Sequence, residues 1–167
     1  DGDMSRASFP FLLTSIIENE SYNGIATFLY DEESISSLRY QIVSQLSPFV
    51  IQTHFVATGQ TEVTYQHKRF DNINVTQDFE RELGSKLPWR DWTEIQGKFG
   101  KQVFENFDSG IDPAMTLTSG LVIDGEIYVR SMNTPFGPYP YPHEMRHGVW
   151  SVTKTMAGML TLMRMAQ

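Results

Sequence analysis

Short segments rich in β-branched and aromatic residues recur through the first part of the chain and constrain its fold more than any other feature. Turn-forming clusters separate these segments; they include Asp31-Glu32-Glu33, Ser47-Pro48 and Gly59-Gln60. The pattern predicts strands at residues 25–30, 38–43, 49–56 and 62–65. Successive strands with short connections usually pair antiparallel. We therefore expect an antiparallel β-rich unit over residues 1–112.

Two segments of the same unit have helical character. Residues 8–18 carry apolar side chains at helical spacing, which predicts a short helix. The side chains expected to face inward are Phe11, Leu12, Ile16 and Ile17. A second helix is predicted at residues 77–83. Strands and helices together indicate the α+β class.

The C-terminal third begins with a different arrangement. Turn residues at 108–113 indicate a boundary, and strand-like residues follow at 116–123 and 126–130. Asp124-Gly125 joins these strands, and this dipeptide is the strongest short-range signal for a hairpin. Several prolines between residues 133 and 143 exclude a helix or a central strand, so we expect an ordered surface loop. A final helix is predicted from residue 151 onward, within a second unit over residues 113–167.

Composition excludes several classes of partner. The 167 residues carry a formal net charge of -7, which argues against a nucleic acid and against an anionic membrane surface. The uncharged stretch between Lys154 and Arg164 is much shorter than the ~18 apolar residues that span a bilayer. The chain has no cysteine, so it forms no disulfide and no thiolate metal site.

Ser151 and Lys154 are the candidate catalytic residues. A serine and a lysine three positions apart are neighbours on one face of a helix. The lysine amine can accept the hydroxyl proton and convert a weak nucleophile into one that attacks a carbonyl carbon. Ser151 also stands where the helix begins, and the helix dipole favours a developing negative charge there. The structural alternative is an N-cap serine followed by a lysine that extends into solvent.

The helix that follows Ser151 is expected to be buried. An apolar stripe at helical spacing is formed by Val152, Met156, Met159, Leu160 and Met163. Leu162 and Met165 lie off this stripe, so the helix is apolar nearly all round, which is typical of a buried helix. Lys154 would then enter the interior, where burial favours the neutral amine that a general base requires.

The stretch GLVIDGEIYVRS, a loop, and GVWSVTKTMAGMLTLM follow one another in this chain. In this order they resemble the start of the catalytic domain of serine β-lactamases and penicillin-binding proteins, whose nucleophile motif is S-x-x-K. The resemblance is greatest to class C β-lactamases, D-aminopeptidases and family VIII carboxylesterases, and covers about residues 116–167. It implies that Ser151 is acylated, that Lys154 is the base, and that the Ser151 N–H forms half of an oxyanion hole. It implies no metal and no cofactor.

Other elements of that family's site do not follow Ser151 in this sequence. Members need a Tyr-x-Asn or Ser-x-Asn element and a Lys-Thr-Gly or His-x-Gly strand, which supplies the second oxyanion N–H. Tyr22-Asn23 and His147-Gly148 are similar but precede the serine. We therefore expect the N-terminal portion of a hydrolase, inactive alone, which a second polypeptide or a C-terminal segment completes.

A second motif competes with this interpretation. Residues 143–147 read H-E-x-x-H, the pattern in which two histidines one helical turn apart bind zinc and the glutamate activates water. Pro142 and Gly148 flank the motif, however, and both disfavour the long helix that it requires. Arg146 would also place a cation near the metal, and no third ligand follows His147.

The sequence thus leads to three hypotheses. The first is a serine hydrolase that cleaves an ester, a β-lactam or a peptide-like amide through an acyl-enzyme on Ser151. Its substrate would be a small molecule or peptide-like. The second is a non-enzymatic ligand-binding module built on the β-rich unit. The third, less well supported, is a zinc hydrolase. The lack of cysteine leaves the compartment open, and a periplasmic or secreted location is favoured.

Overall fold

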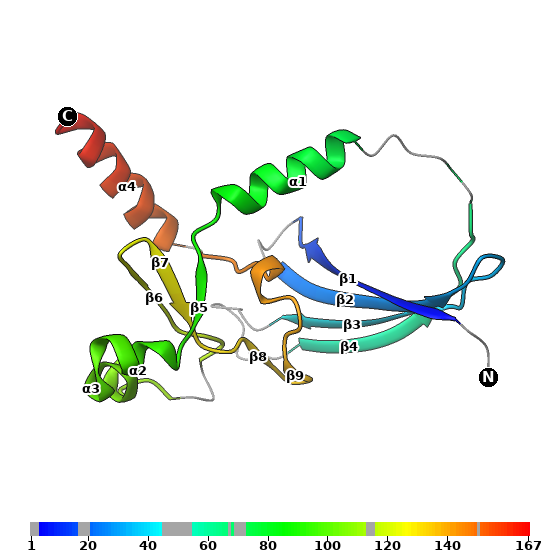
Figure 1. Ribbon diagram of the computed structural model, residues 1–167, viewed down its shortest axis with the longest axis horizontal. Coiled ribbons are helices and arrows are strands. Elements are labelled where there is room, and N and C mark those ends of the chain that lie inside the picture. The colour runs from blue at the N-terminus through cyan, green and yellow to red at the C-terminus, as the bar shows by residue number, and fades with distance from the viewer. Residues whose placement is uncertain are drawn as a thin grey trace. The chain divides into compact units, whose positions relative to one another are not determined.

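The computed structural model describes residues 4–16, 21–44, 55–66, 68, 73–112, 116–149 and 151–167. Its contacts divide the chain into two packing units. The first unit comprises Asp1–Asp31, Ser36–Thr61 and His143–Gln167, and the second comprises Glu32–Ile35 and Glu62–Pro142. The chain mixes helices with an antiparallel sheet at its N-terminus (Figure 1), which agrees with the predicted α+β content.

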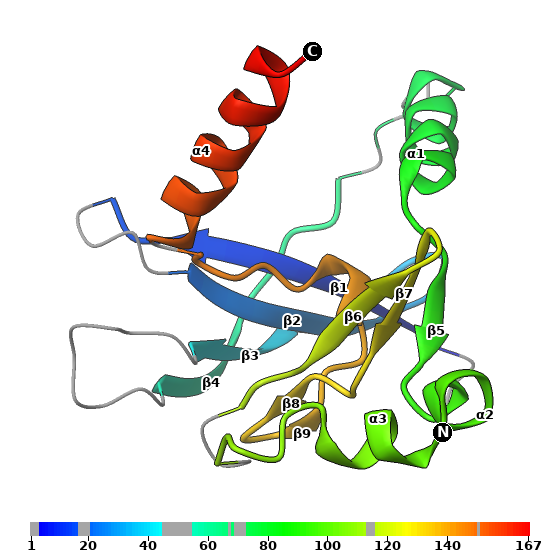
Figure 2. The same cartoon turned by 90° about the vertical axis from the view of Figure 1, so that its left-hand side faces the viewer.

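The first unit contains a four-stranded antiparallel sheet in the order β1-β2-β3-β4. Its strands are β1 (Ser5–Thr14), β2 (Ser21–Tyr30), β3 (Leu38–Ser44) and β4 (Phe55–Thr61). Each strand pairs with its neighbour in the sequence, and the sheet is visibly curved (Figure 2). This confirms the antiparallel sheet and the strands predicted at residues 25–30 and 38–43.

The helix predicted at residues 8–18 is wrong, because β1 occupies Ser5–Thr14. Every residue of β1 has a partner in β2, so ten residues of cross-strand pairing outweigh a weak helical pattern. Pro10 was the signal against a helix, since proline breaks a helix interior but is tolerated in an edge strand. β1 is such an edge strand.

The predictions for the region around β4 are partly wrong. Residues 62–65 form no strand, and most of the strand predicted at 49–56 lies outside the described residues. Gly59-Gln60, predicted as a turn, lies inside β4. Gly59 is opposite Tyr40 of β3, whose side chain occupies the space that a Cβ at position 59 would need. An aromatic ring over a glycine compensates for the packing that a strand glycine lacks.

The second unit contains a three-stranded sheet in the order β5-β7-β6. β6 (Gly120–Ile123) and β7 (Glu126–Val129) form the predicted hairpin, with Asp124 and Gly125 at φ of 52° and 77°. Positive φ at both central positions is what a tight two-residue hairpin requires. β5 (Trp89–Asp91) runs parallel to β7.

This small sheet packs against two short helices, α2 (Glu94–Phe99) and α3 (Lys101–Asn106). Trp92, Ile95 and Tyr128 are its buried centre. Partly buried apolar side chains surround them, namely Val103, Phe104, Leu121 and Ile123. The sequence predicts a domain boundary after residue 112. β5 lies before this residue and β7 after it, yet the two strands pair in one unit, so the packing units do not follow the predicted boundary. That boundary stays a prediction about where a hydrolase-like domain begins.

The remaining elements agree largely with expectation. α1 (Ile73–Ser85) contains the helix predicted at residues 77–83. The proline-rich segment holds a two-stranded hairpin, β8 (Asn133–Thr134) with β9 (Gly137–Pro138), and the short 3-10 helix η2 (Pro142–Glu144). α4 (Val152–Met165) begins where the final helix was predicted. Within the described residues, no helix combines the length and apolar character needed to cross a membrane.

The second unit also contains a network of charged and polar groups around Glu126. Its carboxylate accepts hydrogen bonds from Lys98 Nζ at 2.7 Å, Tyr128 Oη at 2.6 Å and Arg90 Nε at 2.8 Å. These bonds, led by those from Lys98 and Tyr128, lower the pKa of Glu126 from 4.5 to about 2. The three partners come from β5, α2 and β7, so the network ties these elements together.

We expect Glu126→Gln to destabilise the second unit in a pH-dependent way. A carboxyl whose pKa is depressed by folding stabilises the folded state above its unfolded pKa, and this contribution disappears as the pH falls through the folded pKa. The difference in urea midpoint between wild type and variant should therefore be full above pH 4.5 and shrink toward pH 2.

Glu105→Gln is the matched control, because Glu105 makes an exposed ion pair with Lys101 at 3.4 Å. Such surface pairs contribute little, so its midpoint should change little at any pH. A Glu126→Gln difference that stays constant from neutral pH to pH 2 would contradict the assigned role.

Candidate functional site

Ser151 lies immediately before α4, and its side chain makes no capping hydrogen bond with the helix. Lys154 Nζ instead donates a hydrogen bond to Ser151 Oγ at 3.0 Å. The Lys154 N–H also bonds to the Ser151 carbonyl at 3.0 Å, which closes the first turn. The alternative of a serine that caps the helix through its hydroxyl is therefore not what the structure forms. The two candidate residues are brought together as predicted.

The contact has the separation needed for proton transfer. A base must lie within about 2.6–3.2 Å of the atom whose proton it takes. In the charged state the ammonium donates to Oγ, and in the neutral state the same separation lets the amine accept the hydroxyl proton. The pair is thus arranged for nucleophile activation once the lysine is neutral.

The described residues of this chain do not bury the final helix, whose burial stays a prediction about a covering polypeptide. Every side chain from Ser151 to Gln167 is exposed. The large apolar ones are between 53% and 79% exposed, namely Val152, Met156, Met159, Leu160, Leu162, Met163 and Met165. Lys154 is exposed as well, so the chain does not supply the burial on which its expected role as a base depended. An apolar helix is normally covered by other residues, and the described residues do not cover α4.

Asn23 anchors the segment that leads to Ser151. This β2 residue is 6% exposed, the one polar side chain among the buried residues of the described chain. Its Nδ2 donates to the Arg146 carbonyl at 2.7 Å, and the Arg146 N–H donates to Asn23 Oδ1 at 2.8 Å. An amide side chain thereby pairs with a backbone unit far along the chain. The pairing holds the backbone at Arg146 against β2, five positions before Ser151.

Sequence reasoning missed the role of Asn23. The residue was noted only because Tyr22-Asn23 resembles part of a family motif. The available signal was an amide inside the otherwise apolar or small β2 segment SYNGIATFLY, since a buried amide needs partners for both its donor and its acceptor. The sequence does not indicate that Arg146 is the partner, because 123 positions separate the two residues.

The H-E-x-x-H segment does not form the helix that a zinc site of this kind requires. Only Pro142–Glu144 is helical, as a single 3-10 turn, and residues 145–149 are irregular. Among the described residues, no three or more His, Cys, Asp or Glu side chains are grouped to hold a metal ion. His147 is instead partly buried, and burial together with the neighbouring Arg146 charge lowers its pKa. The segment serves as the anchored lead-in to Ser151.

We expect Asn23→Ala to destabilise the first unit by about 1–3 kcal/mol, because it removes both hydrogen bonds to the partly buried N–H and C=O of Arg146. Urea unfolding measures the loss, and hydrogen exchange of the Arg146 amide reports the contact directly. Exchange should be slow in the wild type and fast in the variant. Gln41→Ala, at an exposed position of the same sheet, should change stability by less than about 0.5 kcal/mol. An Arg146 amide that stays protected in Asn23→Ala would refute this anchoring.

Comparisons with protein-family models, with curated proteins and with solved structures found no significant match to this chain. The resemblance to S-x-x-K hydrolases therefore stays a prediction, carried by the residues quoted for it and by the geometry of Ser151 and Lys154.

Proposed function

We propose that this chain carries the nucleophile and the base of a serine acyl hydrolase. The observation that supports this most directly is the 3.0 Å contact between Lys154 Nζ and Ser151 Oγ. It occurs at the start of a helix that does not use the serine hydroxyl as a cap. The substrate carries an electrophilic carbonyl, as in an ester, a β-lactam or a peptide-like amide.

The reaction proceeds in two balanced steps. The neutral Lys154 amine takes the hydroxyl proton while Ser151 Oγ forms a bond to the carbonyl carbon. The bond from that carbon to the leaving group then breaks, and the leaving group receives the proton. In the second step water attacks the acyl-serine ester, the acid is released, and the Ser151 hydroxyl is restored. No external oxidant or reductant enters the balance.

The start of α4 contributes electrostatically to this chemistry. The helix spans Val152–Met165, so its N-terminal end carries the positive pole of a dipole several turns long. The Ser151 N–H lies at that pole, next to the oxygen on which negative charge develops. One such donor is half of an oxyanion hole, and removing a donor of this kind typically costs about 100- to 1000-fold in rate.

The exposed apolar residues of α4 support a covering polypeptide as part of the functional enzyme. A large contiguous apolar patch on the surface of an isolated domain usually marks an interface. We propose that a second polypeptide or a C-terminal segment covers α4 and supplies the second oxyanion donor and the substrate pocket. The same cover would bury Lys154, and burial favours the neutral form of an amine. In this proposal, the binding of the covering polypeptide to α4 also converts Lys154 into the base that activates Ser151.

Active-site labelling tests the proposal. The native assembly that contains this chain is treated with a fluorophosphonate probe and, separately, with a fluorescent penicillin, and the adduct is located by peptide mass spectrometry. We expect the label on Ser151, and its complete loss in Ser151→Ala. Lys154→Ala should slow labelling by about 100- to 10,000-fold, the usual contribution of a general base.

Thr153→Ala is the matched control, since it removes a neighbouring exposed hydroxyl of the same helix turn and should label at the wild-type rate. Absence of label on Ser151 in the folded native assembly, or equal labelling of wild type and Lys154→Ala, would reject the hydrolase assignment.

A further inference from the structure

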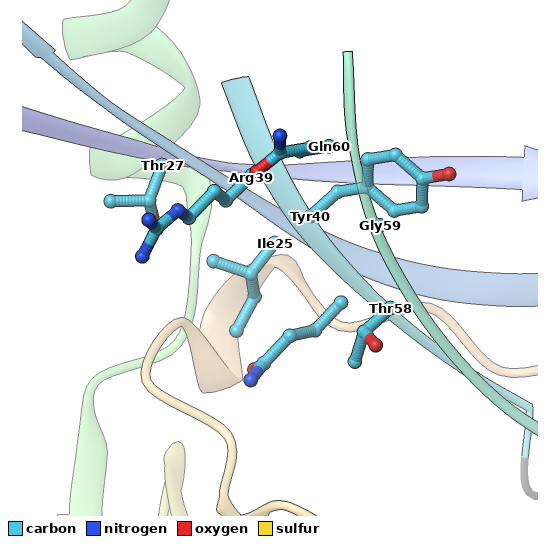
Figure 3. A pocket seen from close by; sticks show the side chains of 8 residues that line it. Ile25, Thr27, Arg39, Tyr40, Thr58, Gly59 and Gln60 are labelled. Atoms are coloured by element: carbon cyan, nitrogen blue, oxygen red, sulfur yellow. The ribbon is translucent and has the colours of Figure 1, made fainter. Parts of the chain in front are cut away.

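The four-stranded sheet carries a second site, independent of Ser151. A cavity of about 510 Å³ lies on the sheet and is lined by residues of β2, β3 and β4 (Figure 3). This volume falls within the range of about 300–1,000 Å³ that is typical of small-molecule sites. Like the sheet, the cavity belongs entirely to the first unit.

Strand register explains which side chains meet there. Thr27 of β2 is opposite Arg39 of β3, which is opposite Gln60 of β4. The adjacent row is Ile25, Gln41 and Thr58. Directly opposed residues share a face of the sheet, and so do residues two apart in one strand. These six side chains therefore project from one face, as two parallel cross-strand rows.

The chemistry of this face is specific. Arg39 is the charged residue of the cavity lining, and no acidic side chain is part of that lining. Within the described residues Arg39 makes neither an ion pair nor a side-chain hydrogen bond, in a chain whose net charge is -7. Two glutamines and two threonines add neutral donors and acceptors, and Ile25 adds an apolar surface. Figure 3 shows the Arg39 side chain extending toward Thr27.

We propose that this cavity binds a small polyhydroxylated organic anion, with its carboxylate or phosphate on Arg39. A guanidinium presents a planar fork of donors that pairs bidentately with an oxyanion. The amide and hydroxyl groups of Gln41, Gln60 and Thr58 suit the hydroxyl groups of such a ligand. A neutral sugar would leave Arg39 unused, and a bare inorganic anion would leave the amides and hydroxyls unused.

The cavity shares strand β2 with Asn23. Asn23 precedes Ile25 by two residues, lies on the same face of β2, and is buried with its side chain paired to Arg146. The binding proposal does not depend on hydrolase activity, because none of the cavity residues belongs to the Ser151 pair.

Isothermal titration calorimetry with four probes tests the site on the wild-type chain. The probes are glucuronate, glucose 6-phosphate, neutral glucose and inorganic phosphate. We expect saturable binding of glucuronate, of glucose 6-phosphate or of both, at least about tenfold tighter than that of glucose or inorganic phosphate. Whichever of the two binds more tightly identifies the anionic group.

Three variants assign the binding to Arg39. Arg39→Gln should weaken binding of the tighter ligand by about 10- to 100-fold, the usual effect of losing a charge-assisted pair. Arg39→Lys should retain part of the binding affinity, because lysine keeps the positive charge but lacks the planar pair of guanidinium donors. Arg6→Gln is the matched control, since Arg6 lies on β1 of the same sheet but outside the cavity, and should bind as wild type does.

Circular dichroism and urea unfolding of each variant show whether the sheet is retained, which exposed substitutions should allow. No saturable binding of either organic anion to the folded wild type would overturn the proposal. Equal affinity in wild type and Arg39→Gln, or tighter binding of inorganic phosphate than of both organic anions, would overturn it too.

Discussion

The hydrogen-bonded pairing of the Asn23 amide with the backbone of Arg146 is the interaction that fixes the segment before Ser151 on the N-terminal sheet. It joins the strand that forms the middle of the N-terminal sheet to the segment just before Ser151. A buried amide left unpaired costs about as much as several surface contacts contribute, so the two sides stay together. The buried polar side chain of Asn23 thus fixes the position of the segment around Arg146 in the first unit.

The two packing units solve the problem of stability differently. The second unit has a small apolar centre of Trp92, Ile95 and Tyr128 and adds a charged network around Glu126 at its edge. The first unit relies on a long cross-strand ladder, with aromatic rings over Gly24 and Gly59. Its α4 contributes no buried side chain at all. The helix that follows the proposed nucleophile therefore receives little support from the described residues, which accords with a site completed by a covering polypeptide.

Local patterns predicted the elements whose stability is local. Asp124-Gly125 predicted the hairpin because those two residues adopt positive φ at low cost, and the serine-lysine spacing predicted a contact within a single helical turn. The failures have a common cause. Residues 8–18 looked helical because periodicity in a short window ignores the ten partners that β2 offers to β1. Gly59 looked like a turn because its compensating ring comes from Tyr40 on another strand.

By itself, the sequence determined strands β2 and β3 of the four-stranded sheet, the hairpin before the proline-rich segment, the start of the final helix, and the proximity of Ser151 and Lys154. These features follow from backbone propensities and from contacts within a few residues. Only the tertiary structure decided that α4 lies exposed, that Asn23 holds the lead-in to Ser151, and that Arg39 lies among neutral side chains in the cavity on the sheet. Each of these depends on strand register or on partners far apart in the chain, because cross-strand pairing and burial are properties of surfaces that meet only after folding.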